Sequence, residues 1–310
     1  MSTYKELKDM NLVDNFLFGA AVSDEECGPL IARTILETIF HKEIRIKNIQ
    51  SEKVVWPTNP DLHGIRLDAY IEEETAEVEA GNIYDIEPEK KSGEKRLLPK
   101  RCRYYHARID ENQLKAGKDY YQLPVVWVIF ITTFDPFDKD RMVYTIRSQC
   151  VEVPEMPYDD SASTLFLYTK GTQGNPPDDL RNLLRYICET TYENAYSPSL
   201  EKVQTCIDKI KQDPTVRRKY MDLKEFIDRE RREAAAEAAE ENKKVTEELK
   251  KTIDKTTAEL DQAKAEQHNF QKLTSILLEE NLFDELKRAT EDETYKESLY
   301  VKFGVKPAQD

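Results

Sequence analysis

Residues 65–89 read IRLDAYIEEETAEVEAGNIYDIEPE, and this stretch decides the fold class. Its two ends, 65–72 and 82–89, mix β-branched and aromatic residues with polar ones, which is typical of strands. The connection 73–81 is rich in acids and ends at a glycine, which indicates an exposed loop. The stretch therefore predicts two neighbouring strands of a hairpin or meander.

Carboxylates are concentrated on these two strands. Asp85, Glu87 and Glu89 share parity, so their side chains would project from one face of a sheet. Asp68 on the preceding strand would reach Glu87 if the two strands pair. Crowded carboxylates repel one another unless water or a cation relieves the repulsion, and oxygen ligands from two strands suit a hard ion such as Mg²⁺. The alternative is an exposed hairpin lined by acids, because spacing alone does not distinguish the two.

The flanking segments extend the pattern to helix, three strands, helix, strand. Gly28-Pro29 is expected to separate two helices within the first helical segment. The continuous apolar run 123–131 indicates a strand that is covered on both faces. The sequence thus predicts an α/β protein with a mixed sheet flanked by helices. The expected elements are helices at 11–40 and 97–115 and strands at 43–50, 123–131, 142–153 and 164–168.

Helices replace strands toward the C-terminus. Asp178 and Ser199 stand in cap-like positions for helices at 178–190 and 199–211, and Pro214 suits the first turn of a very long helix. From residue 225 that helix reads EFIDRERREAAAEAAEENKKVTEELKKTIDKTTAELDQAKAEQ, without glycine or proline. Alanine, glutamate and lysine are strong helix formers, so a helix longer than one domain would bury is expected.

The long helix carries a weak heptad pattern. Leu249, Ile253 and Leu260 occupy core positions, but so do Thr256 and Gln267. A solvated helical arm and a homodimeric coiled coil both remain open. Residues 273–286 are expected to fold back as a short amphipathic helix. The predicted organisation is a domain at 1–212, a long charged helix at 213–272 and a short helical segment at 273–310.

Bulk composition bounds the environment of the chain. The longest apolar run is far shorter than the roughly 20 residues of a membrane-spanning helix, and no export signal precedes it, so a cytoplasmic protein without a membrane partner is expected. Five scattered cysteines, an odd number, are expected to be reduced thiols. The net charge of -14 argues mildly against nucleic acid. Residues 90–108, KKSGEKRLLPKRCRYYHAR, nevertheless hold eight basic residues and one acid, and they form either a solvated helix face or a phosphate-binding segment.

A chain of ordered motifs resembles a known family. The motifs are Arg66-Leu-Asp68, then Ile83-Tyr-Asp-Ile-Glu87, then the segment 100–110, then 114–120, and finally 128–137. In this order they resemble the Rpn family of recombination-promoting nucleases and transposase-like proteins, a branch of the PD-(D/E)XK nuclease superfamily. The resemblance covers roughly residues 10–230. It implies a restriction-endonuclease-like core and a Mg²⁺-dependent DNA endonuclease, with Mn²⁺ as a substitute ion, that acts in recombination, transposition or defence against mobile elements.

The resemblance also assigns site residues. Asp68 would be the acid of the first motif and Glu87 that of the second, and both would hold the metal. Glu89 stands where the superfamily has lysine and this branch commonly has glutamine. Either Glu89 serves as a further ligand or orients water, or the site is weakened and is rescued by Lys90 or Lys91.

Basic residues after the acids are expected to contact DNA, because guanidinium groups bind phosphate oxygens in pairs. These residues are Lys100, Arg101, Arg103 and Arg108, whereas Tyr104, Tyr105 and Tyr120 are expected in the core. The competing hypothesis is a catalytically weakened descendant that keeps the fold as a binding or scaffolding module and dimerises through its C-terminal helix. The residue at position 89 and the acidic net charge favour that alternative.

Overall fold

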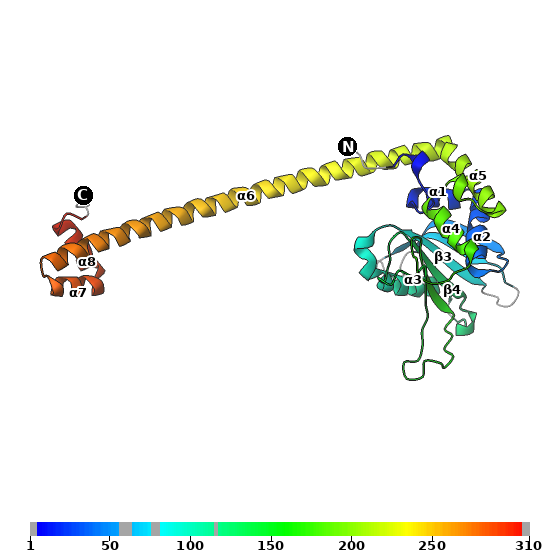
Figure 1. Ribbon diagram of the computed structural model, residues 1–310, viewed down its shortest axis with the longest axis horizontal. Coiled ribbons are helices and arrows are strands. Elements are labelled where there is room, and N and C mark those ends of the chain that lie inside the picture. Colours follow the sequence, from blue (N-terminus) through cyan, green and yellow to red (C-terminus); the bar gives the residue numbers. More distant parts are fainter. Residues whose placement is uncertain (1–4, 56–63, 76–80, 115–116, 306–310) are drawn as a thin grey trace. The chain divides into compact units, whose positions relative to one another are not determined.

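The computed structural model describes residues 5–55, 64–75, 81–114 and 117–305. The chain forms two compact units, Met1–Phe226 and Ile227–Asp310. The first unit contains the expected order of helix, three strands, helix and strand. It is an α/β unit built on one mixed sheet (Figure 1).

Six strands form this sheet, in the order β1-β2-β3-β4-β6-β5. β1, β2 and β3 are antiparallel neighbours, β4 and β6 continue in parallel with β3, and β5 returns antiparallel to β6. A parallel pair requires a crossover connection, which the helix between β3 and β4 supplies. The strands are β1 (Ile46–Val55), β2 (Ile65–Glu73), β3 (Asn82–Glu89), β4 (Val125–Thr132), β5 (Val143–Ile146) and β6 (Ala162–Tyr168).

Helices cover both faces of the sheet. One face packs against four helices that lie together in Figure 1, and the other face packs against α3 alone. Side chains alternate between the faces, so Ile86 joins the four-helix side while Ile83 joins the α3 side, as their opposite parity predicts. The helices are α1 (Asn15–Ser23), α2 (Cys27–Phe40), α3 (Leu98–Gln113), α4 (Asp178–Cys188) and α5 (Pro198–Gln212).

Two helix starts differ from the prediction. The break between α1 and α2 falls at residues 24–26 rather than at Gly28-Pro29. Proline is tolerated in the first turn of a helix, where its missing N–H has no partner to lose. The Asp24 carboxylate accepts a hydrogen bond from the Cys27 N–H at 2.8 Å and closes this turn. Likewise Ser197, not Ser199, caps α5 by accepting from the backbone N–H of Leu200.

The strand predicted at 142–153 was too long, because β5 ends at Ile146. Residues 147–161 have no regular structure, and most of them are exposed. Pro154 and Pro157 lie in this segment, and proline cannot donate to a sheet ladder. The prediction that the connection after β2 is exposed from residue 73 onward was also wrong at its first position, because Glu73 is buried within β2. Residues 76–80 of that connection lie outside the described part of the chain.

Cys27 and Cys206 form a disulfide, which corrects the prediction that all cysteines are reduced thiols. The two residues are 179 positions apart in sequence. They meet because α2 and α5 pack together on the four-helix side of the sheet, where Ile31 and Ile207 are both fully buried. No local sequence pattern predicts a contact between residues so far apart in the sequence.

The second unit contains most of α6 (Pro214–Glu279), together with α7 (Phe283–Glu291) and α8 (Glu293–Lys302). α6 begins at Pro214, as predicted. Leu249 and Ile253 on its middle part are 59% and 55% exposed, so the expected seam has no partner within the described chain. Near its end, Leu273 and Leu277 are buried against α7 and α8. None of the described helices combines the length and the hydropathy that crossing a membrane requires.

The reversal of the chain near its end lies later than predicted. Residues 273–279 continue α6, and the turn is made around Asn281, which has a φ of 58°. Asparagine tolerates this left-handed conformation better than most residues do. Leu299 and Tyr300 of α8 then complete a small core with α6.

Candidate active site

The site begins where the β2–β3 ladder ends. The last pair of this ladder joins Ala69 to Ile86, so Asp68 and Glu87 are the next residues outward. The backbone N–H of Asp68 donates to Glu87 Oε1 at 2.8 Å instead of to a strand. Asn15 at the start of α1 donates to Asp68 Oδ2 at 3.3 Å. Asp68 and Glu87 therefore lie in contact on adjacent strands, through the backbone N–H of Asp68 and the carboxylate of Glu87.

Asp85 is the third carboxylate of this site. It lies opposite Tyr70 on β2 and is fully buried. Neither of its oxygens has a hydrogen-bond partner of ordinary geometry among the described residues. Burial raises the pKa of Asp85 well above its usual range, and the charge of Asp68 raises it further. The alternation of residues 82–89 predicts Asp85 on the same face as Glu87 and Glu89, whereas the family resemblance assigns ligand roles to Glu87 and Glu89 and none to Asp85.

Burial dominates the electrostatics of the other two carboxylates as well. It raises the pKa of Glu87 well above the usual range, and the charges of Asp85 and Asp68 add to this effect. The pKa of Asp68 is raised to about 6, mainly by burial, although Arg66 and Arg101 oppose the rise. Because Asp85 and Glu87 are buried, the alternative of an exposed hairpin lined by acids was wrong.

Arg101 on α3 is the cation of the site. Its Nη2 lies 3.5 Å from Glu87 Oε2, and its Nη1 lies 2.7 Å from Glu89 Oε2. The guanidinium also sits 5.6 Å from the centre of the Tyr105 ring and 5.3 Å from that of Phe130. A guanidinium held between carboxylates and aromatic faces is well fixed. In this arrangement Arg101 is occupied by acids, whereas the sequence predicted a phosphate contact for it.

Position 89 differs from what the resemblance implies. Glu89 faces Arg101, and its Oε1 accepts the backbone N–H of Lys91 at 2.9 Å. The Lys91 side chain is exposed, and the Lys90 ammonium pairs with Asp14. The positive charge beside the acids therefore comes from α3, and neither lysine supplies it.

The remaining predicted DNA contacts divide into two groups. Lys100 and Arg103 lie exposed on α3. Arg108 is 3% exposed and pairs with Glu111, so the prediction that it contacts DNA was wrong. Arg108 lies on the buried face of α3, next to Ile109, which is also buried. Tyr120 is also opposite to expectation, since it is 83% exposed instead of in the core.

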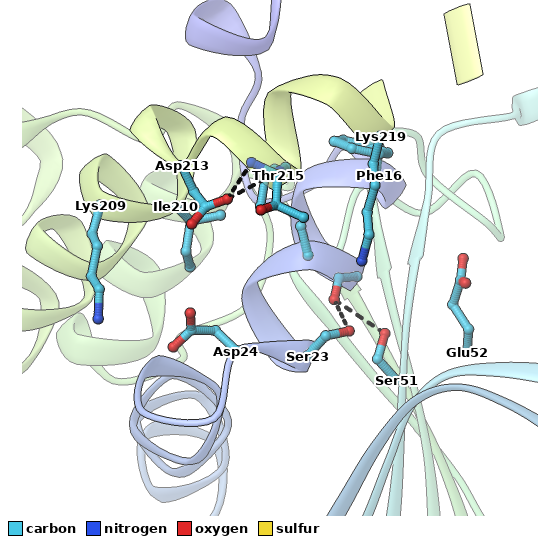
Figure 2. A pocket seen from close by; sticks show the side chains of 13 residues that line it. Phe16, Ser23, Asp24, Ser51, Glu52, Lys209, Ile210, Asp213, Thr215 and Lys219 are labelled. Carbon is cyan, nitrogen blue, oxygen red and sulfur yellow. Dashed lines mark hydrogen bonds between the residues drawn. The ribbon is translucent and has the colours of Figure 1, made fainter. Parts of the chain in front are cut away.

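A cavity of about 330 Å³ lies among α1, β1, the end of α5 and the start of α6, and the site carboxylates are not part of its wall. Glu52 forms part of its wall, and the charge of Glu52 raises the pKa of Asp68. Figure 2 shows the hydroxyls of Ser23 and Ser51 turned toward one carbonyl, that of Gly19, to which both donate. Polar and apolar side chains together line this cavity, which is separate from the carboxylates.

The donors at this site suit a hard cation in chemistry. The unpartnered oxygens of Asp85 and the raised pKa values of Asp68, Asp85 and Glu87 indicate a concentration of negative charge that a divalent ion would relieve. Within the described ranges, however, no three histidine, cysteine or acidic side chains are arranged to hold a metal ion. Glu87 faces the Asp68 N–H and Arg101, and Glu89 faces Arg101. Metal binding would therefore require Glu87 to turn away from Arg101.

Comparison of the chain with family models, with curated proteins and with solved structures gives no match.

Proposed function

We propose that this chain is a divalent-metal-dependent DNA endonuclease. The observation that carries the proposal is the convergence of Asp68, Asp85 and Glu87 from two adjacent strands, with the oxygens of Asp85 buried and unpartnered. Buried carboxylates without partners are costly, and such groups concentrate at functional sites. The proposed reaction is phosphodiester hydrolysis, and the proposed context, which rests on the resemblance to the Rpn family, is recombination, transposition or defence.

Each residue has a separate task in this proposal. Asp68 lies at the partly exposed rim and Glu87 behind it, and these two would hold the ion, Mg²⁺ or Mn²⁺. When bound, the ion polarises the phosphodiester and lowers the pKa of water. Asp85 lies behind Asp68 and Glu87 as a buried carboxyl group whose raised pKa favours the neutral form until a cation is bound. Arg101 provides the positive charge that the superfamily places two residues after its second acid, where this chain has Glu89.

The architecture supports the same proposal. The order of helix, three strands, helix and strand builds a mixed sheet with helices on both faces. That is the core which the resemblance to PD-(D/E)XK nucleases implies. The paired acids stand just beyond the last pair of the β2–β3 ladder, where the partly exposed Asp68 leaves a way in for a substrate.

One observation favours a second function, that of a non-catalytic binding or scaffolding module. Arg101 already neutralises Glu87 and Glu89 through two ion pairs. If this guanidinium stays in place when Mg²⁺ is supplied, the ion is kept out of the site and the protein has the fold without the hydrolytic activity. The Arg101→Gln variant distinguishes the two functions. This variant gains metal binding only if the Arg101 guanidinium is the group that keeps the ion out of the site.

Plasmid nicking measured together with calorimetric titration of Mg²⁺ and Mn²⁺ tests the proposal. The Asp68→Ala and Glu87→Gln variants should each nick roughly 100-fold more slowly than the wild type, because each loses a ligand worth several kcal/mol in the transition state. Glu94→Gln, a change at an exposed acid outside the site, is the matched control and should behave as the wild type. A wild-type protein that neither binds the ions nor nicks DNA would leave the module as the function.

A further inference from the structure

Basic residues gather where the N-terminal segment meets the start of α6. Residues 5–9 and 209–224 together contain eight basic and four acidic residues, although the whole chain has a net charge of -14. The N-terminal segment lies beside the beginning of α6 in Figure 1. All of these residues belong to the first compact unit.

This cluster is continuous with the carboxylate site. Lys90, the residue after Glu89, pairs with Asp14, and Asp14 also lies 3.5 Å from the Lys5 ammonium. The carbonyl of Lys5 accepts a hydrogen bond from the Tyr220 hydroxyl on α6. A row of contacts therefore leads from the end of β3 to the first turns of α6.

Beyond Lys5, this row of contacts ends at a hollow in the protein surface. Lys211 Nζ donates to the carbonyl of Lys8 at 3.0 Å, and Arg217 Nε donates to the carbonyl of Lys211 at 3.0 Å. The hollow between them has a volume of about 280 Å³, and Lys224 is also part of its wall. Glu6, which is 3.4 Å from Lys224, is the acid that lines it.

Two of these cations are free to meet an anion. Lys8 and Arg217 are both exposed, and neither has an acidic partner in the part of the chain that the structure describes. The Arg217 hydrogen bond goes to a neutral carbonyl, so its guanidinium keeps its charge and its outer donors. Asp14 and Glu6 pair with other cations of the cluster, so Lys8 and Arg217 are the two whose charges are left to bind phosphate oxygens.

We infer that the basic track formed by Lys90, Lys5, Lys211, Lys8, Arg217 and Lys224 binds the phosphate backbone of duplex DNA on one side of the cleavage site. The inference rests on the proposed nuclease function and adds the path of its substrate. A polyanion fits because the cations are spread along a row that starts at the carboxylates, whereas a single small anion would occupy the hollow alone. The path is distinct from the exposed pair Lys100 and Arg103 on α3.

The test measures binding of a fluorescently labelled duplex by anisotropy, with the full chain, in EDTA and over a range of salt concentrations. The variant Lys8→Glu with Arg217→Glu should bind roughly tenfold more weakly, and the slope of log K against log salt should fall by about two. The control Lys47→Glu with Lys118→Glu changes the net charge equally at exposed positions far along the sheet from Glu89. It should bind nearly as the wild type does.

A neutral variant, Lys8→Gln with Arg217→Gln, keeps the test valid if charge reversal disturbs the fold. Its slope of log K against log salt should fall by the same amount as that of the charge-reversal variant. Binding and slope equal to those of the control would overturn the track, as would a wild type that does not bind duplex DNA. Cleavage is scored separately. If the wild type binds DNA through Lys8 and Arg217 but does not nick it, the nuclease function is refuted and the basic track stands. If the wild type nicks DNA but the Lys8 and Arg217 variants bind as tightly as the control, the nuclease function stands and the basic track is refuted.

Discussion

The hairpin of β2 and β3 buries carboxylates at both ends, and the two ends are built in opposite ways. At one end, Glu73 is 5% exposed and accepts hydrogen bonds from Tyr84 Oη and Asn82 Nδ2, each at 2.6 Å, and from Lys42 Nζ at 3.0 Å. Burial raises its pKa, but these three donors outweigh burial, and the pKa is lowered overall. Glu73 is therefore a fully satisfied structural charge.

At the other end, burial prevails. Asp85 has no hydrogen-bond partner of ordinary geometry among the described residues, and Glu87 is surrounded by further acids, so burial raises both pKa values. Both ends lie in one hairpin with similar burial, and only the number of donors differs. Burial alone thus does not identify a functional carboxylate, whereas burial without partners does.

The largest expected effect concerns stability at the satisfied end. Glu73→Ala should lower the free energy of unfolding by about 3 kcal/mol, because it leaves Tyr84, Asn82 and Lys42 without their common acceptor. Asp85→Leu should instead be neutral or raise stability by roughly 1 kcal/mol, because it removes a buried polar group that lacks hydrogen-bond partners. Urea unfolding followed through the fluorescence of Trp127 in β4 reports on this unit.

Glu43→Ala, at an exposed acid, is the control for this comparison and should change stability little. If Asp85→Leu destabilises the protein as much as Glu73→Ala does, the two ends do not differ in the way described. Asp85 would then have a structural role.

A smaller effect is expected from pH. A group whose pKa is lower in the folded than in the unfolded protein stabilises the fold above the unfolded pKa, and this contribution is lost as pH falls through the folded pKa. Glu73 is such a group, because its hydrogen-bond donors hold its folded pKa below the ordinary value of 4.5 for a glutamate. The wild type should therefore lose stability below pH 4.5 more steeply than Glu73→Gln, measured by urea unfolding at each pH. Equal slopes for the two proteins would show that Glu73 does not titrate as argued.

The smallest effect is expected from the tail, which should leave both ends of the hairpin unchanged. Removal of the residues after Glu233 should alter the stability of the first unit by less than about 0.5 kcal/mol, because both cores of that unit are formed by residues up to Tyr220. Light scattering of the full and shortened chains tests the coiled coil at the same time. If each chain has the mass of its own monomer, a dimer through α6 is excluded. An insoluble shortened chain would show that the first unit needs the tail.

Local pattern was sufficient for much of the fold. The alternation in 82–89 placed Asp85 and Glu87 on one face, the continuous apolar run predicted the doubly covered strand β4, and the uninterrupted Ala/Glu/Lys segment predicted α6. Each of these properties depends on neighbours within a few residues, through the period of a strand or the propensity of a helix. Sequence can therefore determine them by itself.

Partners distant in sequence were decided only by the tertiary structure. Cys27 meets Cys206, Arg101 reaches Glu87 and Glu89 from another element, and Glu73 finds its three donors, because packing brings together groups whose separation carries no local signal. The same holds for the lack of partners at Asp85, which depends on what every neighbouring element fails to provide. The amino-acid sequence thus determined which acids share a face, and the folded chain decided which of them are neutralised and which are left without a partner.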